Sequence, residues 1–275
     1  MLLRLRAQKS TLQTDYWRLP SRFMAIEAFG TTDRGCVRDE NEDRILVDDS
    51  LGLYVVCDGM GGSKHGEIAA EVAVGAVRYY IDSSRDRYDV SWPFGYAFEL
   101  SLDANRLATG VRLANREIWR TGEQSLECAG MGTTIAAVLI GDGRAVVGNV
   151  GDTRVYLCRE NRLAQITVDD TMIATMVRSG LLSVQSAASH PMRNVITQAV
   201  GSQEEVEVHL HEETIVPGDA LLICSDGLYN LVEEPDILAA LTENSSPEAV
   251  AKRLVDAAIN SGAPDNVSAV VMRYS

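Results

Sequence analysis

The feature that most constrains this chain is a set of four acidic motifs spread over its whole length. They are 38–43 (RDENED), 58–62 (DGMGG), 225–228 (SDGL) and 264–267 (PDNV). Three of them adjoin apolar segments of the length of a β-strand, at 53–57, 220–224 and 267–272. Carboxylates held at the ends of buried strands repel one another, and a hard divalent cation with oxygen ligands offsets that repulsion. The motifs therefore predict a metal centre.

The composition bounds the size of the core and the kind of partner. With 275 residues and 46% hydrophobic content, the chain can bury one large core, as a single domain of this size does. Its formal net charge of -14 argues against nucleic acid or an anionic membrane as the main partner, because both require a basic surface. Most of the acidic excess is expected to be solvated surface, and no apolar stretch is long enough to predict a membrane span.

The cysteines indicate the redox environment. Five are present, at 36, 57, 128, 158 and 224, and no two of them form a C-x-x-C pair. Those at 57, 158 and 224 fall in apolar strand-like runs and are expected to be small core residues. Unpaired buried thiols suit a reducing compartment, so the sequence predicts a cytoplasmic protein.

The N-terminal segment differs from the rest of the chain. Residues 1–23 are rich in basic side chains and lack the apolar region of a secretory signal. A flexible arm, a docking segment and an artefact of start-site choice all remain open for this extension. The predicted organisation is an extension of unknown role at 1–23 and a single catalytic domain at 24–275.

Three further motifs complete an ordered series. They are 130–134 (GMGTT), 149–154 (NVGDTR) and 190–194 (HPMRN). One Asp-Gly pair would be ordinary turn chemistry, but seven short motifs in this order are specific. From about Met24 to Tyr274 the chain resembles the metal-dependent Ser/Thr protein phosphatases of the type 2C (PPM) family, in their compact bacterial form.

Hydrophobic periodicity and turn residues predict an α+β fold with mostly antiparallel sheets. Strands are expected at 24–32, 44–49, 52–57, 132–140, 144–150, 153–159, 162–166, 205–212, 219–225 and 267–273. Helices are expected at 65–81, 95–121, 170–179, 191–200, 235–243 and 247–260. The resemblance implies the specific architecture, a four-layer α-β-β-α sandwich in which two sheets are flanked by helix pairs.

The resemblance also implies a set of metal ligands. Asp58 would bridge two ions, and the backbone carbonyl of Gly59 would join the second. Asp226 and Asp265 would complete the shell of the first ion, and Glu42 would reach the second through water. Oxygen-only, water-rich shells suit Mn²⁺ or Mg²⁺ rather than zinc.

The expected catalytic residues are Arg38, Asp58 and Asp226. A hydroxide that bridges the two metals would attack the phosphorus of phosphoserine or phosphothreonine. Arg38 would bind the phosphate with its planar, bidentate guanidinium; the alternative is a surface arginine beside acidic neighbours. Asp43 and Asn266 are expected to hold the metal-ligand segments in place by hydrogen bonds, without contacting the metals themselves.

The sequence departs from the bacterial pattern in two places near the expected metals. Ser63 stands where relatives often carry a histidine, so the general acid is either His65 or a metal-bound water, with His65 then a surface residue. Glu127 stands where relatives often carry an aspartate that holds a third metal, for which Asp226 would be the other ligand.

A third departure and two secondary expectations concern the segment that follows. Residues 169–171 read Asp-Asp-Thr where relatives often show Asp-His-Ser, in a region that corresponds to the mobile flap of the family. Asp152 is expected to bind the amides of its own turn. His209 and His211 alternate on one strand and are expected to be exposed.

These features predict an enzyme that hydrolyses phosphoserine and phosphothreonine on protein substrates and opposes a Ser/Thr kinase. Two alternatives stay open: a catalytically silent module with the same fold that acts by binding, and a hydrolase of small phosphoesters. Retention of Arg38, Asp58, Asp226 and Asp265 disfavours the silent module.

Overall fold

The computed structural model describes residues 26–61, 65–87, 90–187 and 190–275. One five-stranded antiparallel sheet has the order β1 (Ile26–Asp33), β12 (Val267–Tyr274), β11 (Ala220–Cys224), β8 (Arg154–Arg159), β9 (Arg162–Gln165). A second has the order β10 (His209–Thr214), β7 (Arg144–Val150), β6 (Ile135–Gly141), β3 (Leu53–Cys57), β2 (Arg44–Asp48). A short pair, β4 (Gly59–Met60) and β5 (Gly132–Thr133), continues β3 and precedes β6.

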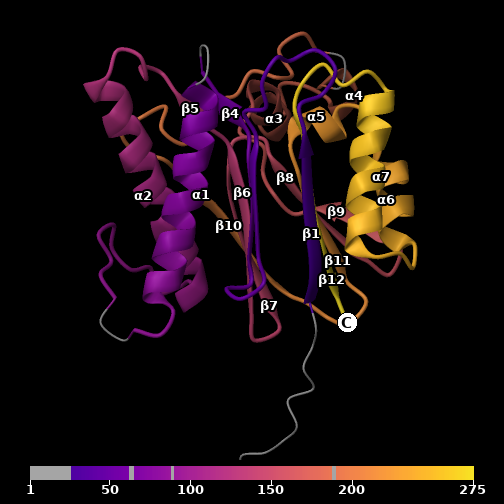
Figure 1. The fold of residues 1–275 in the computed structure, drawn as a ribbon, viewed down its shortest axis with the longest axis horizontal. Helices are drawn as coiled ribbons and strands as arrows, with labels where there is room; N and C mark the ends of the chain where they lie inside the picture. Colours follow the sequence, from indigo (N-terminus) through magenta and orange to yellow (C-terminus); the bar gives the residue numbers. More distant parts are fainter. Residues whose placement is uncertain (1–25, 62–64, 88–89, 188–189) are drawn as a thin grey trace, which may run out of the picture.

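The two sheets face each other, and a helix pair covers each outer face (Figure 1). Helices α1 (His65–Ser84) and α2 (Leu102–Gln124) pack on the second sheet, and α6 (Glu234–Thr242) and α7 (Pro247–Asn260) on the first. Three short helices lie at the upper end of the sandwich in that view: α3 (Met172–Arg178), α4 (Val184–Ala187) and α5 (Asp226–Tyr229). The predicted α-β-β-α sandwich is confirmed.

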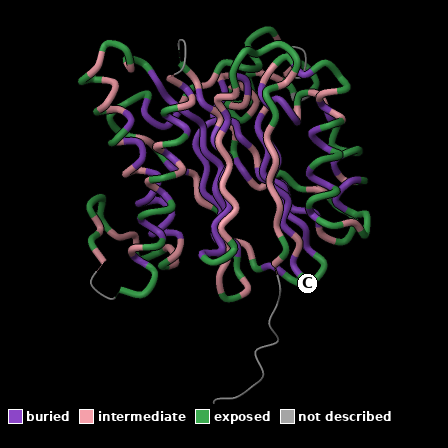
Figure 2. The backbone as a smooth tube through the Cα atoms, viewed as in Figure 1, coloured by how far each residue is buried: buried purple, intermediate pink, exposed green. Residues whose placement is uncertain are grey.

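Alternation along the central strands distributes side chains between two cores. In β3, Leu53, Val55 and Cys57 face the helices, whereas Tyr54 and Val56 face the other sheet. All five residues are buried, as Figure 2 shows for the strands in the middle of the molecule. Burial of each large aliphatic side chain contributes about 1.5–3 kcal/mol, so the run is stabilised from both faces. The strand end that carries Asp58 is therefore held rigidly.

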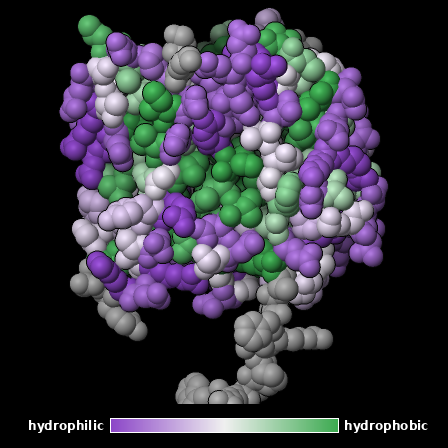
Figure 3. Space-filling model, viewed as in Figure 1, coloured by the Kyte–Doolittle hydropathy of each residue, from purple (hydrophilic) through white to green (hydrophobic). Residues whose placement is uncertain are grey.

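One edge of the sandwich leaves the inter-sheet core partly open. Strands β1 and β2 are edge strands of the two sheets, and every residue of β2 is half-buried. Figure 3 shows apolar atoms gathered in the middle of this face, between the two helix pairs. Ile45 and Val47 of β2 pack against the inter-sheet core from this side.

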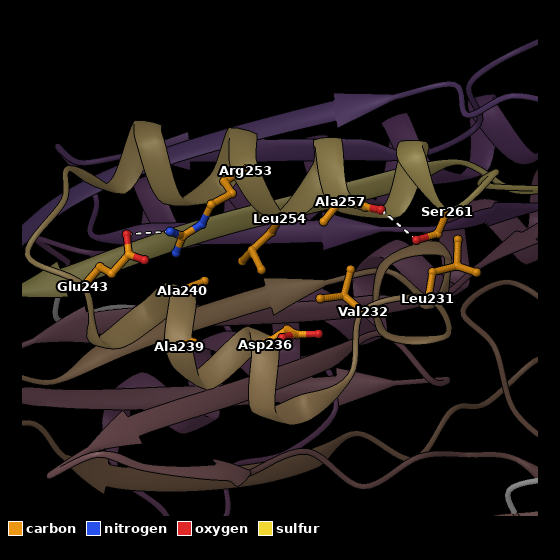
Figure 4. A pocket seen from close by; sticks show the side chains of 10 residues that line it. All are labelled: Leu231, Val232, Asp236, Ala239, Ala240, Glu243, Arg253, Leu254, Ala257 and Ser261. Atoms are coloured by element: carbon orange, nitrogen blue, oxygen red, sulfur yellow. Dashed lines mark hydrogen bonds and ion pairs between the residues drawn. The ribbon is translucent and has the colours of Figure 1, made fainter.

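The outer layer also contains a groove of about 350 Å³ between α6 and α7. Figure 4 shows Leu254 and Ala240 at its base, with an ion pair at one end. That pair joins Arg253 Nη1 to Glu243 Oε2 over 2.5 Å, and it links the end of α6 to α7.

Two predicted helices differ from the structure. The helix expected from residue 95 begins at Leu102, because the Ser101 hydroxyl caps it by accepting from the amide of Ala104, while Tyr96 stacks edge-on against aromatic neighbours. The helix expected at 191–200 is wrong. That segment forms turns and two isolated β-bridges, at Ile196 and Val200, since its amides bind carbonyls of other segments.

Other sequence predictions have simple outcomes. The cysteines at 57, 158 and 224 are buried and unpaired, as predicted. The expected extension at 1–23 lies outside the described residues. Among the residues that are described, no helix combines the length and apolar character required to cross a bilayer.

Candidate metal centre

The acidic motifs converge at the end of the sandwich that carries β4, β5 and α5 (Figure 1). Asp58 follows β3 of one sheet, whereas Asp226 follows β11 and Asp265 precedes β12 of the other. Burial, and then the charges of Asp43 and Asp226, raise the pKa of Asp58 well above its ordinary value. The backbone of Asp58 is fixed on both sides, because its amide donates to Thr134 Oγ1 and its carbonyl accepts from the Thr134 amide.

Glycines allow the backbone segments of the site to approach closely. A Cβ on Gly59 would lie 2.2 Å from the carbonyl oxygen of Gly66, the second residue of α1. A Cβ on Gly227 would lie 2.0 Å from the carbonyl oxygen of Asn266. These two contacts join β4 to α1 and α5 to the start of β12, and only glycine fits at either position.

Asp43 forms the buried base of the site. Its Oδ2 accepts hydrogen bonds from the hydroxyls of Ser225 (2.9 Å) and Ser268 (2.6 Å). Its Oδ1 is buried and has no hydrogen-bond partner among the described residues. Burial raises the pKa of Asp43 to about 7, and the charges of Asp226 and Asp265 act in the same direction. Through Ser225, the carboxylate of Asp43 is connected to the segment that carries Asp226.

Asp226 and Asp152 form the other side of the acidic cluster. Burial and the charge of Asp265 raise the pKa of Asp226 to about 6, while Asn230 Nδ2 donates to its Oδ2 over 3.2 Å. Asp152 is only 5% exposed, and burial together with the charge of Asp226 raises its pKa to about 7. Sequence reasoning placed Asp152 in a turn and missed its membership of this cluster. The only signal was its place directly after the buried strand β7.

Arg38 approaches the cluster from the surface. Its Nη2 donates to Asp265 Oδ2 over 2.7 Å, and its side chain is 52% exposed. Asn266 holds the segment in place, because its Oδ1 accepts from the amide of Glu42 and its Nδ2 donates to the carbonyl of Glu40. The structure therefore brings Arg38, Glu42 and Asn266 to the same end of the sandwich as the strand-end aspartates.

The donor set fits a hard cation. In the described residues no three His, Cys, Asp or Glu side chains are already grouped as a ready-made metal site. Such a group is not required where waters supply most ligands and Arg38 holds Asp265. Burial and mutual repulsion raise the pKa values of Asp43, Asp58 and Asp226, and Oδ1 of Asp43 has no partner among the described residues, so joint ionisation of these carboxylates requires a compensating positive charge. A divalent cation with oxygen ligands would offset this charge.

The remaining candidates from the sequence are Glu127, His65 and Ser63. Glu127 is exposed in the connection between α2 and β5 and makes no hydrogen bond to Asp226 in the described part of the chain. His65 is half-buried and opens α1, with its Cβ 3.5 Å from the point where a Cβ on Gly61 would lie. Ser63 lies outside the described residues.

A pocket of about 740 Å³ adjoins the cluster beneath α3. Arg154 forms its inner wall: its guanidinium binds Asp169 through Nε and Nη2 and stacks 3.7 Å from the centre of the Tyr229 ring. Asp152 and Asn230 also line it, and Asn230 Nδ2 donates to Asp226 Oδ2, so the pocket and the cluster share a boundary. Such a space can receive the chain that flanks a bound phosphoryl group.

The expected exposure of both strand histidines is half wrong. His211 is exposed, but His209 is half-buried, and its Nε2 lies 2.7 Å from Oδ1 of the buried Asp170. The difference follows from the contact with Asp170, which brings the ring of His209 against a buried carboxylate.

An α-β-β-α sandwich with a carboxylate cluster at one end of its sheets is the arrangement that the resemblance to metal-dependent protein phosphatases implies. The family model described as protein phosphatase 2C matches residues 37–258. The chain therefore belongs to the protein phosphatase 2C family.

Individual relatives support the assignment. The Ser/Thr protein phosphatase PstP of Mycobacterium tuberculosis is 37% identical over 240 residues, which cover 87% of this chain and 43% of the relative. This chain thus spans less than half of that protein. The Ser/Thr phosphatase stp of Listeria welshimeri is 32% identical over 248 residues, 88% of this chain and 93% of the relative. The catalytic domain of PstP, solved with two manganese ions, is 32% identical with a TM-score of 0.77, covering 90% and 98% of the two chains.

Proposed function

We propose that this protein hydrolyses phosphoserine and phosphothreonine on protein substrates with the help of Mn²⁺ or Mg²⁺. The observation that carries the proposal is the meeting of Asp58, Asp226 and Asp265, from both sheets, beside the exposed guanidinium of Arg38. The PstP catalytic domain that binds two manganese ions has the same fold at 32% identity. An opposing Ser/Thr kinase and a cytoplasmic location belong to the same proposal.

The proposed ligands are those that the family resemblance implies. Asp226 and Asp265 would hold one cation, Asp58 would bridge to a second, and the Gly59 carbonyl and Glu42 would complete that second site. Glu127 is the proposed ligand of a third cation. When bound, these cations act as Lewis acids and lower the pKa of coordinated water.

The chain's own residues position the substrate. Arg38 would bind the phosphoryl oxygens, and to do so it exchanges its 2.7 Å contact with Asp265 for the phosphate. Asp43 and Asn266 would keep the ligand-bearing backbone fixed through the hydrogen bonds described above. The leaving seryl or threonyl oxygen requires a proton, and His65 and water are the two candidate donors.

The proposal also covers the organisation of the chain. Residues 24–275 would form one catalytic domain, preceded by an extension at 1–23 whose role is open. The matched range of 37–258 lies wholly inside the proposed domain.

The experiment is a metal-dependence assay on a phosphothreonine peptide. Activity should require added Mn²⁺ or Mg²⁺ and vanish with EDTA. Asp226→Asn removes the charge at nearly constant size and should lower kcat by at least about two orders of magnitude while the circular dichroism spectrum is unchanged. Asp82→Asn, an exposed aspartate on α1, is the matched control. Full activity in excess EDTA would refute the proposal.

A further inference from the structure

The buried carboxylate of Asp170 is hydrogen-bonded to three separate segments of the chain. The residue is 6% exposed, and its Oδ2 accepts from the amide of Gly151 and from Gln198 Nε2, both over 3.0 Å. Its Oδ1 lies 2.7 Å from His209 Nε2. Since an ionised carboxylate only accepts, the imidazole donates this hydrogen bond. Both carboxylate oxygens thus accept hydrogen bonds, and the three donors come from three separate segments of the chain.

The backbone of Asp170 reinforces these connections. Its amide donates to the carbonyl of Gly151 over 3.0 Å, and its carbonyl accepts from the amide of Thr197 over 2.7 Å. Gln198 in turn binds both the amide and the carbonyl of Glu207, two residues before β10. Asp170 therefore ties together the β7–β8 turn, the 196–200 segment and the start of β10.

The turn that Asp170 holds also carries Asp152. Gly151 has φ +92°, and a Cβ there would lie 2.7 Å from Thr134 Cγ2, so the turn has one tightly packed conformation. The carbonyl of Asp152 accepts from the Tyr229 hydroxyl over 3.0 Å. Asp152 is thereby oriented into the cluster that contains Asp226.

We infer that Asp170, held by His209, is a positioning residue that fixes the Gly151–Asp152 turn and so places Asp152 beside Asp226. The inference rests on the proposed phosphatase function. It concerns a contact between two segments of this chain, with the acid at 170, after β9, and the histidine on β10.

The test compares two substitutions at His209 that differ in one donor. His209→Gln keeps a donor in reach of Asp170, because a glutamine Nε2 takes nearly the place of an imidazole Nε2. His209→Leu removes it. His211→Leu, two residues along the same strand and exposed, is the matched control. Steady-state kinetics are measured with saturating Mn²⁺ on a phosphothreonine peptide and on p-nitrophenyl phosphate, well below each melting temperature.

His209→Leu should lower kcat about tenfold or more on both substrates, with KM within about twofold of the wild type. His209→Gln should restore most of the loss, and His211→Leu should behave as wild type. If His209→Leu does not fold, Asp170→Asn takes its place and should show the same loss of kcat.

Three results would overturn the inference. Unchanged kcat with a lowered melting temperature would make the pair purely structural. A KM that rises for the peptide alone would mean that the Asp170–His209 pair affects substrate contact rather than the position of Asp152. An inactive wild type would remove the proposed function, and the inference with it, whereas an active wild type with an unaffected His209→Leu would remove the inference alone.

Discussion

Arg38 donates a 2.7 Å hydrogen bond from Nη2 to Oδ2 of Asp265, so a half-exposed guanidinium meets a carboxylate of the candidate metal centre directly. The pair lies near the surface, where such contacts contribute little to stability. Its significance is geometric, because it shows that the Arg38 guanidinium reaches the acidic cluster.

Arg38→Ala should raise KM for a phosphothreonine peptide by about tenfold or more and lower kcat less, because the guanidinium holds the phosphate in the ground and transition states alike. Arg38→Lys should recover only part of the affinity, since an ammonium lacks the bidentate fork. Calorimetry should show Mn²⁺ binding undiminished. Loss of Mn²⁺ binding with Arg38→Ala would mean that the residue supports the metal site instead.

If His65 rather than water protonates the leaving group, His65→Gln should slow hydrolysis of a phosphothreonine peptide by roughly 10²-fold and that of p-nitrophenyl phosphate only slightly. The threonyl alkoxide requires a proton as it leaves, whereas p-nitrophenolate leaves without one. Both rates are measured on one enzyme preparation, so that the active fraction cancels. Small, equal effects on the two substrates would make His65 a surface residue and leave the proton to water.

The raised pKa of Asp43 predicts how the stability of the metal-free protein depends on pH. Its ordinary pKa of 3.8 rises to about 7 in the fold, so the native state binds more protons than the unfolded chain between these values. The free energy of unfolding should therefore fall as pH rises from about 4 to 7. Melting curves in EDTA at pH 5 and pH 8 should show the higher melting temperature at pH 5.

Asp43→Asn isolates the contribution of this residue. The amide oxygen can still accept from Ser225 and Ser268, but the buried charge is removed. The variant should melt higher than the wild type at pH 8 and show a flatter pH profile. A wild type whose melting temperature rose between pH 5 and pH 8 would contradict the raised pKa of Asp43.

Gly66→Ala should destabilise the protein by about 1–3 kcal/mol, because the new Cβ would lie 2.7 Å from the carbonyl carbon of Gly59 and 2.8 Å from the amide of Met60. Gly75→Ala in the same helix is the control, since nothing lies within 4 Å of a Cβ there. That variant should gain up to about 1 kcal/mol from helix propensity. Urea unfolding measures both, and equal effects would exclude the close β4–α1 contact as the cause.

Local signals predicted much of the fold. The bounds of β7 and α7 agree with the predicted 144–150 and 247–260, because a Gly-Asp-Gly turn precedes one and Ser246 with Pro247 begins the other. The 191–200 segment was predicted wrongly, since its amides bind distant backbone such as the carbonyl of Thr133. Local periodicity carries no information about such partners.

The candidate site, like the fold, could be predicted from the sequence only in part. Asp58, Asp226 and Asp265 were identified because each adjoins a buried strand and a turn glycine or proline. The hydrogen bonds of Asp43 to Ser225 and Ser268 join residues separated by more than half of the chain. Asp170 likewise hydrogen-bonds to His209, with helices α3 and α4 between them in the sequence. These contacts depend on how the two sheets are stacked, which the motifs themselves do not encode.

The origin of the three strand-end aspartates has a consequence for synthesis and breakdown of the protein. Asp58 belongs to the first quarter of the chain and follows a strand of one sheet, whereas Asp226 and Asp265 belong to the last quarter and adjoin strands of the other sheet. A nascent chain that has not yet released its final strand therefore has no complete centre, and a single cut anywhere between Asp58 and Asp226 leaves no fragment that carries all three aspartates. The centre would be complete only when translation and assembly of the whole sandwich are finished.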